Sequence, residues 1–137
     1  MRKAMVGLLF LVSWVGVFSQ TSARNTTTYP VIVARVALTN QTAPIPPTTI
    51  VTPKQARLYR VSYYLDCGGQ NLNWMILLHW VDTNGTSETF TSAPCNSPSN
   101  PSLGVATVRA SASSPLRYET TGVAGHYDLF FTVERLN

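Results

Sequence analysis

The sequence predicts an all-β protein built as a closed double-sheet sandwich or barrel. Apolar and polar residues alternate with a period of two along about eight segments, as in strands that bury one face. Glycine, proline and asparagine separate these segments, and the chain after its N-terminal region shows no 3.6-residue helical period. Many short strands divided by such turn residues are typical of sandwiches and barrels.

The N-terminal region has the pattern of a secretory signal peptide. Arg2 and Lys3 precede a short apolar run, and small residues allow cleavage after Ser19 or Ala23. The apolar run is shorter than the ~20 residues of a typical membrane span, so an uncleaved anchor is the less favoured alternative. We therefore expect a secreted protein, extracellular or periplasmic, with no membrane span in the mature chain. The predicted division is a signal peptide over 1–23, a flexible lead over 24–30 and one domain over 31–137.

Each expected strand lies between turn residues. The prolines within 40–47 cannot donate to a strand ladder, so this segment must be a connection. Asn84-Gly85 predicts a tight hairpin between the strands on either side. The expected strands cover 31–39, 48–53, 58–65, 72–82, 86–92, 103–110, 116–121 and 126–136.

The segment 58–82 is the centre of the predicted fold. It reads as two adjacent strands joined by a glycine-rich turn. In the second of these strands both faces are apolar, because Met75, Leu77 and Val81 oppose the face that carries Trp74. We therefore expect this strand to be covered on both sides, by another sheet or by another copy of the chain.

The charges and cysteines limit the classes of function. The net charge is +4, and the basic residues are scattered rather than clustered, so we expect no nucleic-acid partner. Cys67 and Cys95 fall in two predicted loops at one end of the fold, and an exported chain favours a disulfide between them. The sequence has no Cys-x-x-Cys redox motif and no histidine pair at zinc-ligand spacing.

Catalysis is not expected, because the sequence lacks a motif that assembles a nucleophile with a base. A small exported hydrolase that uses His126 and Asp128 is the alternative, although no Gly-x-Ser-x-Gly elbow accompanies them. We expect no cofactor. A calcium site at Asp82, Asn84 and Glu88 is an open alternative, since this spacing equally describes an ordinary hairpin.

Binding or assembly is the favoured function. Trp74 and Trp80, beside Gln70, Asn71 and Asn73, are the residue types that contact sugars, so a glycan or a surface protein is an expected partner. Phe130 is an interface candidate, because it points away from its apolar neighbours in the last strand. The sequence also holds N-glycosylation sequons, at Asn25, Asn40 and Asn84.

The segment Leu58-Tyr59-Arg60-Val61-Ser62-Tyr63-Tyr64-Leu65, together with Ile50-Val51-Thr52-Pro53 and Tyr127-Asp128-Leu129-Phe130-Phe131-Thr132-Val133, resembles the TNF/C1q-like jelly-roll superfamily. It also resembles small exported jelly-roll proteins of unknown function. The resemblance implies an eight-stranded antiparallel jelly roll over 31–137, and it places both cysteines in loops that bear a disulfide in several TNF-like proteins. It further implies a homotrimer packed around an aromatic sheet. The candidate interface or ligand residues are Tyr59, Tyr63, Trp74, Trp80 and Phe130.

The sequence thus predicts an exported, non-catalytic binding or assembly module that self-associates. Two other functions remain open, the small hydrolase described above and a structural subunit of a surface layer or fibre.

Overall fold

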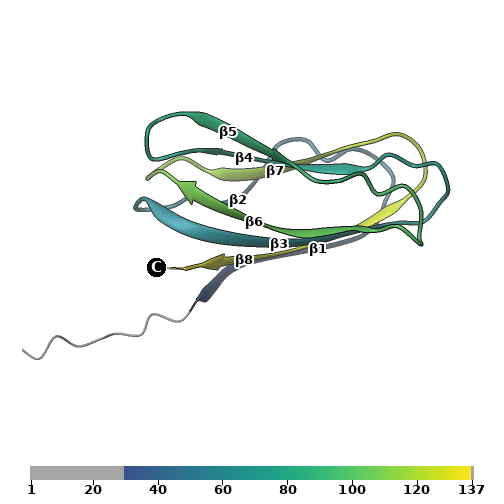
Figure 1. The fold of residues 1–137 in the computed structure, drawn as a ribbon, viewed down its shortest axis with the longest axis horizontal. Coiled ribbons are helices and arrows are strands. Elements are labelled where there is room, and N and C mark those ends of the chain that lie inside the picture. The colour runs from purple at the N-terminus through teal and green to yellow at the C-terminus, as the bar shows by residue number, and fades with distance from the viewer. Residues whose placement is uncertain (1–29, 137) are drawn as a thin grey trace, which may run out of the picture.

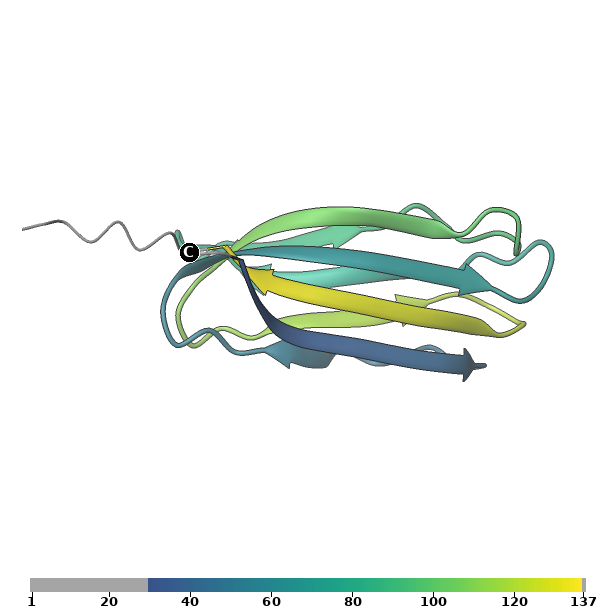
Figure 2. The ribbon, with the colours of Figure 1, turned by 90° about the horizontal axis from the view of Figure 1, so that it is seen from below.

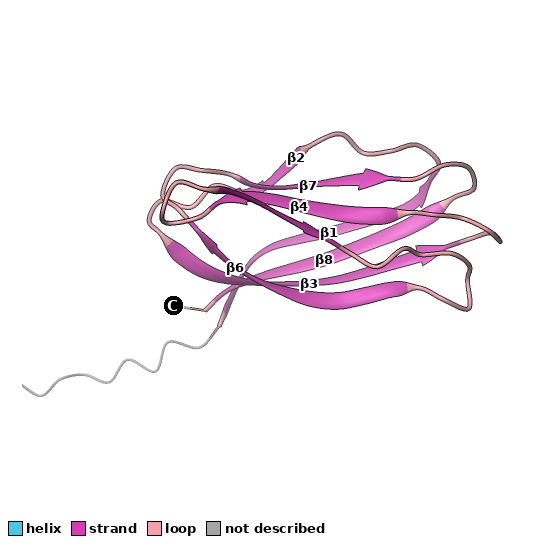
Figure 3. Ribbon diagram, turned by 45° about the horizontal axis from the view of Figure 1, so that its top comes forward, coloured by secondary structure: helices cyan, strands magenta, loops and turns pink. Residues whose placement is uncertain are grey.

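The structure is a computed structural model that describes residues 30–136. The predicted signal peptide and almost all of the flexible lead lie outside the described residues. Across 30–136 the regular structure is entirely β (Figure 3), and no helix there could cross a membrane. The strands are β1 (Val31–Gln41), β2 (Thr48–Val51), β3 (Arg57–Cys67), β4 (Met75–Val81), β5 (Ser87–Thr91), β6 (Ser102–Ala110), β7 (Leu116–Thr121) and β8 (Tyr127–Arg135).

The strands form two four-stranded sheets that pack face to face, with the orders β1-β8-β3-β6 and β2-β7-β4-β5 (Figures 1 and 2). The chain folds as one long hairpin with its tip between β4 and β5. Accordingly β3 pairs with β6, β2 with β7 and β1 with β8, all antiparallel. Rolling this hairpin brings β8 beside β3 and β7 beside β4. The predicted jelly-roll sandwich is confirmed.

One expectation about the centre of the chain is wrong. β3 and β4 lie in opposite sheets, so the glycine-rich segment between them crosses from one sheet to the other instead of joining paired strands. The crossing is held by backbone hydrogen bonds, from Gly68 N–H to His126 O at 2.9 Å and from Leu72 N–H to Asn96 O at 3.1 Å. β4 therefore begins at Met75 rather than at Leu72.

The core lies between the two sheets and follows the predicted alternation. Every second residue of β3 and β8 points inward, and burial of these apolar surfaces is the main driving force of folding. The buried positions on these two strands are Tyr59, Val61, Tyr63, Leu65, Cys67, Tyr127, Leu129, Phe131 and Val133. On β4, Ile76 and Leu78 are also buried, whereas Met75, Leu77 and Val81 face outward and are partly exposed. No second cover for this outer face comes from residues 30–136.

The predicted disulfide between Cys67 and Cys95 is confirmed. Cys67 is the last residue of β3 rather than a loop residue, and Cys95 forms an isolated bridge with Trp74 just before β4. Both cysteines are fully buried, with Cα atoms 6.1 Å apart. Because β3 and β4 belong to different sheets, the bond ties the two sheets together at one end of the sandwich.

The β4–β5 hairpin is the tight turn that Asn84-Gly85 predicts. The Asp82 carboxylate accepts hydrogen bonds from the backbone N–H groups of Asn84 and Thr86, at 2.8 and 2.9 Å. Gly85 has a φ of +84°, in the left-handed region that favours glycine.

Replacing Gly85 by alanine is expected to lower the free energy of unfolding by about 1 kcal/mol. A Cβ on Gly85 would meet no atom within 4 Å, so the cost comes from the backbone conformation alone. Urea unfolding followed by circular dichroism measures it. Thr83→Ala, at an exposed position of the same turn, is the control and should stay within ~0.5 kcal/mol of the parent. Equal stability of Gly85→Ala and the parent would contradict the prediction.

Candidate interaction surface

The outer face of the β1-β8-β3-β6 sheet carries a group of exposed apolar side chains. The strand register puts Leu103, Tyr64 and Phe130 in one row across β6, β3 and β8. These three strands lie side by side in the sheet that Figure 2 shows from below. Val105 follows on β6, and the rings of Tyr64 and Phe130 lie 6.2 Å apart between centroids. The exposed fractions of Leu103, Val105, Tyr64 and Phe130 are 66%, 59%, 39% and 38%. Single exposed apolar residues are ordinary, but a contiguous group marks an interaction site. We call these four residues the apolar patch.

On β6 the inward positions nearest the patch carry the small residues Gly104 and Ala106, while Leu103 and Val105 alternate with them and face outward. The ring of Tyr63 lies over β6 on the inner side and packs against Phe90, with 5.7 Å between ring centroids. A Cβ on Gly104 would lie 2.7 Å from Tyr63 Oη, so a larger side chain there would require the Tyr63 ring to shift. A one-residue slip would also turn Arg109 into the core. Side-chain size alone therefore does not reveal that Leu103 is exposed, and the sequence analysis missed it.

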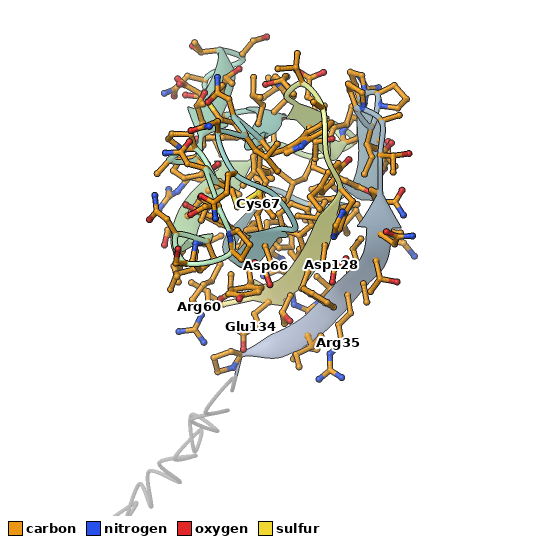
Figure 4. The ribbon with its side chains drawn as sticks, turned by 90° about the vertical axis from the view of Figure 1, so that its right-hand side faces the viewer. Arg35, Arg60, Asp66, Cys67, Asp128 and Glu134 are labelled. Carbon is orange, nitrogen blue, oxygen red and sulfur yellow. A yellow bond between two sulfur atoms is a disulfide. The ribbon has the colours of Figure 1, made fainter. Side chains whose placement is uncertain are left out.

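Acidic residues lie next to the apolar patch, toward the disulfide end. Asp66 and Asp128 are direct cross-strand partners on the outer face of β3 and β8 (Figure 4). Asp128 accepts a hydrogen bond from Asn40 N–H at 2.7 Å, and Asp66 accepts one from Cys67 N–H at 2.9 Å. Within residues 30–136 neither carboxylate has a cationic partner. Two like charges directly opposite each other are unfavourable, so a cation from outside would stabilise them.

Basic residues lie on the other side of the apolar patch. Arg60 Nε donates to Glu134 Oε2 at 2.6 Å, and this hydrogen bond is the main reason that the pKa of Glu134 is lowered and that of Arg60 is raised. Arg35 is exposed and makes no ion pair with any carboxylate of the described chain. Figure 4 shows Arg35 and Arg60 projecting from the outer side of the sheet. The face therefore runs from the acidic pair, through the row of Leu103, Tyr64 and Phe130, to the row that contains Arg35 and Val105, and then to the Arg60–Glu134 ion pair.

Most of the aromatic residues predicted for an interface lie in the core of one chain. Tyr59, Tyr63 and Trp74 are 3%, 8% and 0% exposed, so little of their surface is available to a second copy, and their role in an interface or ligand site stays a prediction. They are inward because the alternation of their strands points them at the second sheet. Trp74 Nε1–H donates to Ala124 O at 2.9 Å, so this indole does not offer a platform for a sugar. Phe130 does lie on an exposed face, as its position in the last strand indicates.

Trp80 is partly buried against the core and also lines a surface pocket of about 290 Å³ together with His79 and Arg117. Sugar binding at Trp80 stays a prediction. His79 lies on the outer face of the second sheet, between partners that the sequence analysis did not connect. Its Nδ1 is 3.0 Å from Thr89 Oγ1, and its Nε2 is 3.2 Å from Glu119 Oε1. These residues come from three strands, so no local motif marks them.

The residues of the alternative hydrolase are not joined in the structure. No hydrogen bond links His126 to Asp128 within the described chain, and Asp128 instead accepts the Asn40 N–H. The His126 ring packs on Gly68, where an added Cβ would overlap it. The open calcium alternative finds little support, since two backbone N–H groups already bind the Asp82 carboxylate. Residues 30–136 contain no cluster of three or more His, Cys, Asp or Glu side chains able to hold a metal.

The fold and this surface define a jelly-roll domain with a candidate contact face on one sheet. No protein-family model and no curated protein matches the chain. Among solved structures, the chain is similar to the VP2 subviral particle of infectious bursal disease virus, with a TM-score of 0.44 and 13% identity over 77% of this chain and 31% of that chain. It is also similar to a chain in the structure of infectious bursal disease virus Gt strain, with a TM-score of 0.40 and 10% identity. That match covers 80% of this chain and 32% of the other. The chain thus spans about a third of those chains, and a likeness this remote carries no argument about function.

Proposed function

We propose that the protein is a non-catalytic assembly module that associates with a second copy of itself through the outer face of the β1-β8-β3-β6 sheet. The observation that carries this proposal is the apolar patch, in which Leu103 and Val105 remain more than half exposed in the single chain. Covering these side chains removes apolar surface from water, which favours association.

Charge is the reason to choose a second copy as the partner. The uncompensated acids Asp66 and Asp128 lie on one side of the row of Leu103, Tyr64 and Phe130, and the uncompensated Arg35 lies on the other. A two-fold axis along the row of Tyr64 and Phe130 sets two such faces antiparallel. The rows of Leu103, Tyr64 and Phe130 then cover each other, and the acidic row of each copy lies against the row of the other that contains Arg35 and Val105. A two-fold contact satisfies both copies in the same way, and opposite charges fix its register.

This contact differs from the trimer that the TNF/C1q-like resemblance implies. The trimer was expected to use Tyr59, Tyr63 and Trp74, which have little exposed surface in the folded chain. The outer-face contact keeps Phe130 from the expected set and adds Tyr64, its cross-strand partner, in place of the buried residues.

Light scattering after size-exclusion chromatography, over a range of protein concentrations, tests the proposal. We expect twice the chain mass for the parent protein. Leu103→Glu is expected to weaken association by about 10-fold or more, because it puts a charge in the covered patch. Arg35→Glu is expected to weaken it less, and the effect should shrink at high salt because exposed charges are screened.

Val123→Glu is the matched control, since Val123 is 72% exposed and lies in the β7–β8 connection, outside the patch. It should leave the mass unchanged. A monomer at every concentration would overturn the proposal. A trimer, or a dimer that Leu103→Glu leaves intact, would show that another surface forms the contact.

A further inference from the structure

A pocket of about 350 Å³ is lined by residues near the start of β3 and the end of β8. Figure 1 shows these two strand ends together at the end of the sandwich where the C-terminus lies, opposite the end where β3 finishes at Cys67. Part of its wall is the connection from β2 to β3. Three of the side chains that line it are cations, Lys54, Arg57 and Arg135, and none is acidic. The Tyr59 side chain also reaches the pocket.

The two arginines occupy strand positions that ordinarily face the core. Arg57 precedes the buried Tyr59 by two residues on β3, and Arg135 follows the buried Val133 by two on β8, so alternation points them inward. Tyr59 and Arg135 are also direct cross-strand partners. Inward positions of a sandwich normally carry apolar residues. Two positively charged guanidinium groups at the mouth of this pocket are therefore unusual for inward positions of a sandwich.

The positive charges of the pocket are not compensated within the described chain. Arg57 donates to Gln55 Oε1 at 2.8 Å, but that amide is neutral. The ion pairs of residues 30–136 involve Arg60 and His79, and none includes Lys54, Arg57 or Arg135. Burial raises the pKa of Tyr59, while the charges of Arg135 and Arg57 act to lower it, as expected for two guanidinium groups near the phenol. Across 30–136 the Tyr59 hydroxyl has no hydrogen-bond partner.

We propose that this pocket binds an oxyanion, a carboxylate, sulfate or phosphate group carried by a small polar ligand. Arg57 and Arg135 supply planar sets of N–H donors that match two oxygens at once. Lys54 adds a point charge at the rim, and Tyr59 donates its O–H to a further oxygen. The pocket has the volume of a small-ligand site, so it accommodates a group such as an acidic sugar and not only a bare ion.

This site is separate from the proposed contact between copies. The pocket opens from the inner side of the sheet at its end, whereas the apolar patch lies on the outer face. Association and anion binding can therefore fail independently, and the two experiments have different readouts.

Titration of the purified protein at constant ionic strength tests the proposal, with NMR signals of the Tyr59 ring and the arginine Nε–H groups as readout. The probes are sodium sulfate, inorganic phosphate and glucuronate, with glucose as the neutral control. At least one oxyanion should give saturable shifts, and glucose should give none. Tighter binding of glucuronate than of sulfate would assign an acidic sugar, and the reverse order would assign a site for the inorganic group. Absence of saturation by every oxyanion up to about 50 mM would overturn the proposal.

Arg135→Gln should weaken binding about 10-fold or more, because it removes one positively charged guanidinium group and its N–H donors. Tyr59→Phe keeps the buried ring and removes only the hydroxyl, so it should weaken binding without unfolding the protein. Arg109→Gln is the matched control, since Arg109 is exposed on β6 and does not line the pocket. If Arg109→Gln weakened binding as much as Arg135→Gln, the effect would be one of overall charge, and the pocket would not be the site.

Discussion

Replacing Trp74 by alanine is expected to lower the free energy of unfolding by about 3–5 kcal/mol. Its side chain is fully buried, and its ring lies 4.3 Å from that of Tyr127 between centroids. Gly122 packs so closely that an added Cβ would overlap the indole. The neighbours are thus shaped around this ring, and a cavity would remain when it is removed. The indole N–H of Trp74 also donates to Ala124 O, a hydrogen bond that alanine cannot make.

Urea unfolding followed by far-UV circular dichroism measures this loss. Trp74→Phe should cost less, since it keeps most of the ring volume and leaves chiefly the Ala124 carbonyl without its donor. Val123→Ala, at a position that is 72% exposed, should change stability by no more than ~0.5 kcal/mol. A loss below ~1 kcal/mol for Trp74→Ala would contradict a packed core at this position.

Removal of the disulfide is expected to lower the free energy of unfolding by about 3–4 kcal/mol. Cys67 and Cys95 are 28 residues apart in sequence, so the bond removes many conformations from the unfolded chain. It also joins the two sheets at the end of the sandwich where β3 passes to β4. The double variant Cys67→Ala with Cys95→Ala should show the full loss.

The parent protein unfolded in urea with and without a reductant gives the same comparison without a change of side chain. The unfolding midpoint should fall only when the bond is broken, and the double alanine variant should not respond to the reductant. An unchanged midpoint on reduction would contradict the prediction. The effects of Trp74→Ala and of disulfide removal should not add, because Trp74 and Cys95 exchange backbone hydrogen bonds of 3.2 and 2.8 Å.

The proposed contact and the proposed pocket lie on opposite faces of the same sheet. On β3, Tyr64 faces outward into the apolar patch, while Arg57 and Tyr59 point inward at the end of the sandwich. A face-to-face dimer therefore leaves the end pocket of each copy open. An assembled form would carry two anion sites, one for each copy.

Local patterns in the sequence predict much of this fold. The alternation in 58–65 and 126–136 identifies β3 and β8, and Asn84-Gly85 identifies the hairpin, because strand period and turn chemistry depend only on near neighbours. The outward direction of Phe130 follows from the same period. The disulfide follows from the export context and from the two predicted loops that contain the cysteines, and predicting it does not require the strand pairing.

Local patterns alone identify the strand segments, the turns and the alternation of residues along each strand. The three-dimensional pairing of the strands places β3 and β4 in opposite sheets and buries Trp74 in the core. It also leaves Leu103 exposed, while Tyr63 covers the neighbouring Gly104 on the inner side. It also brought Arg57 and Arg135 to one pocket from strands far apart in the chain. The physical reason is that alternation gives a strand two faces, whereas the pairing of distant strands decides what each face meets.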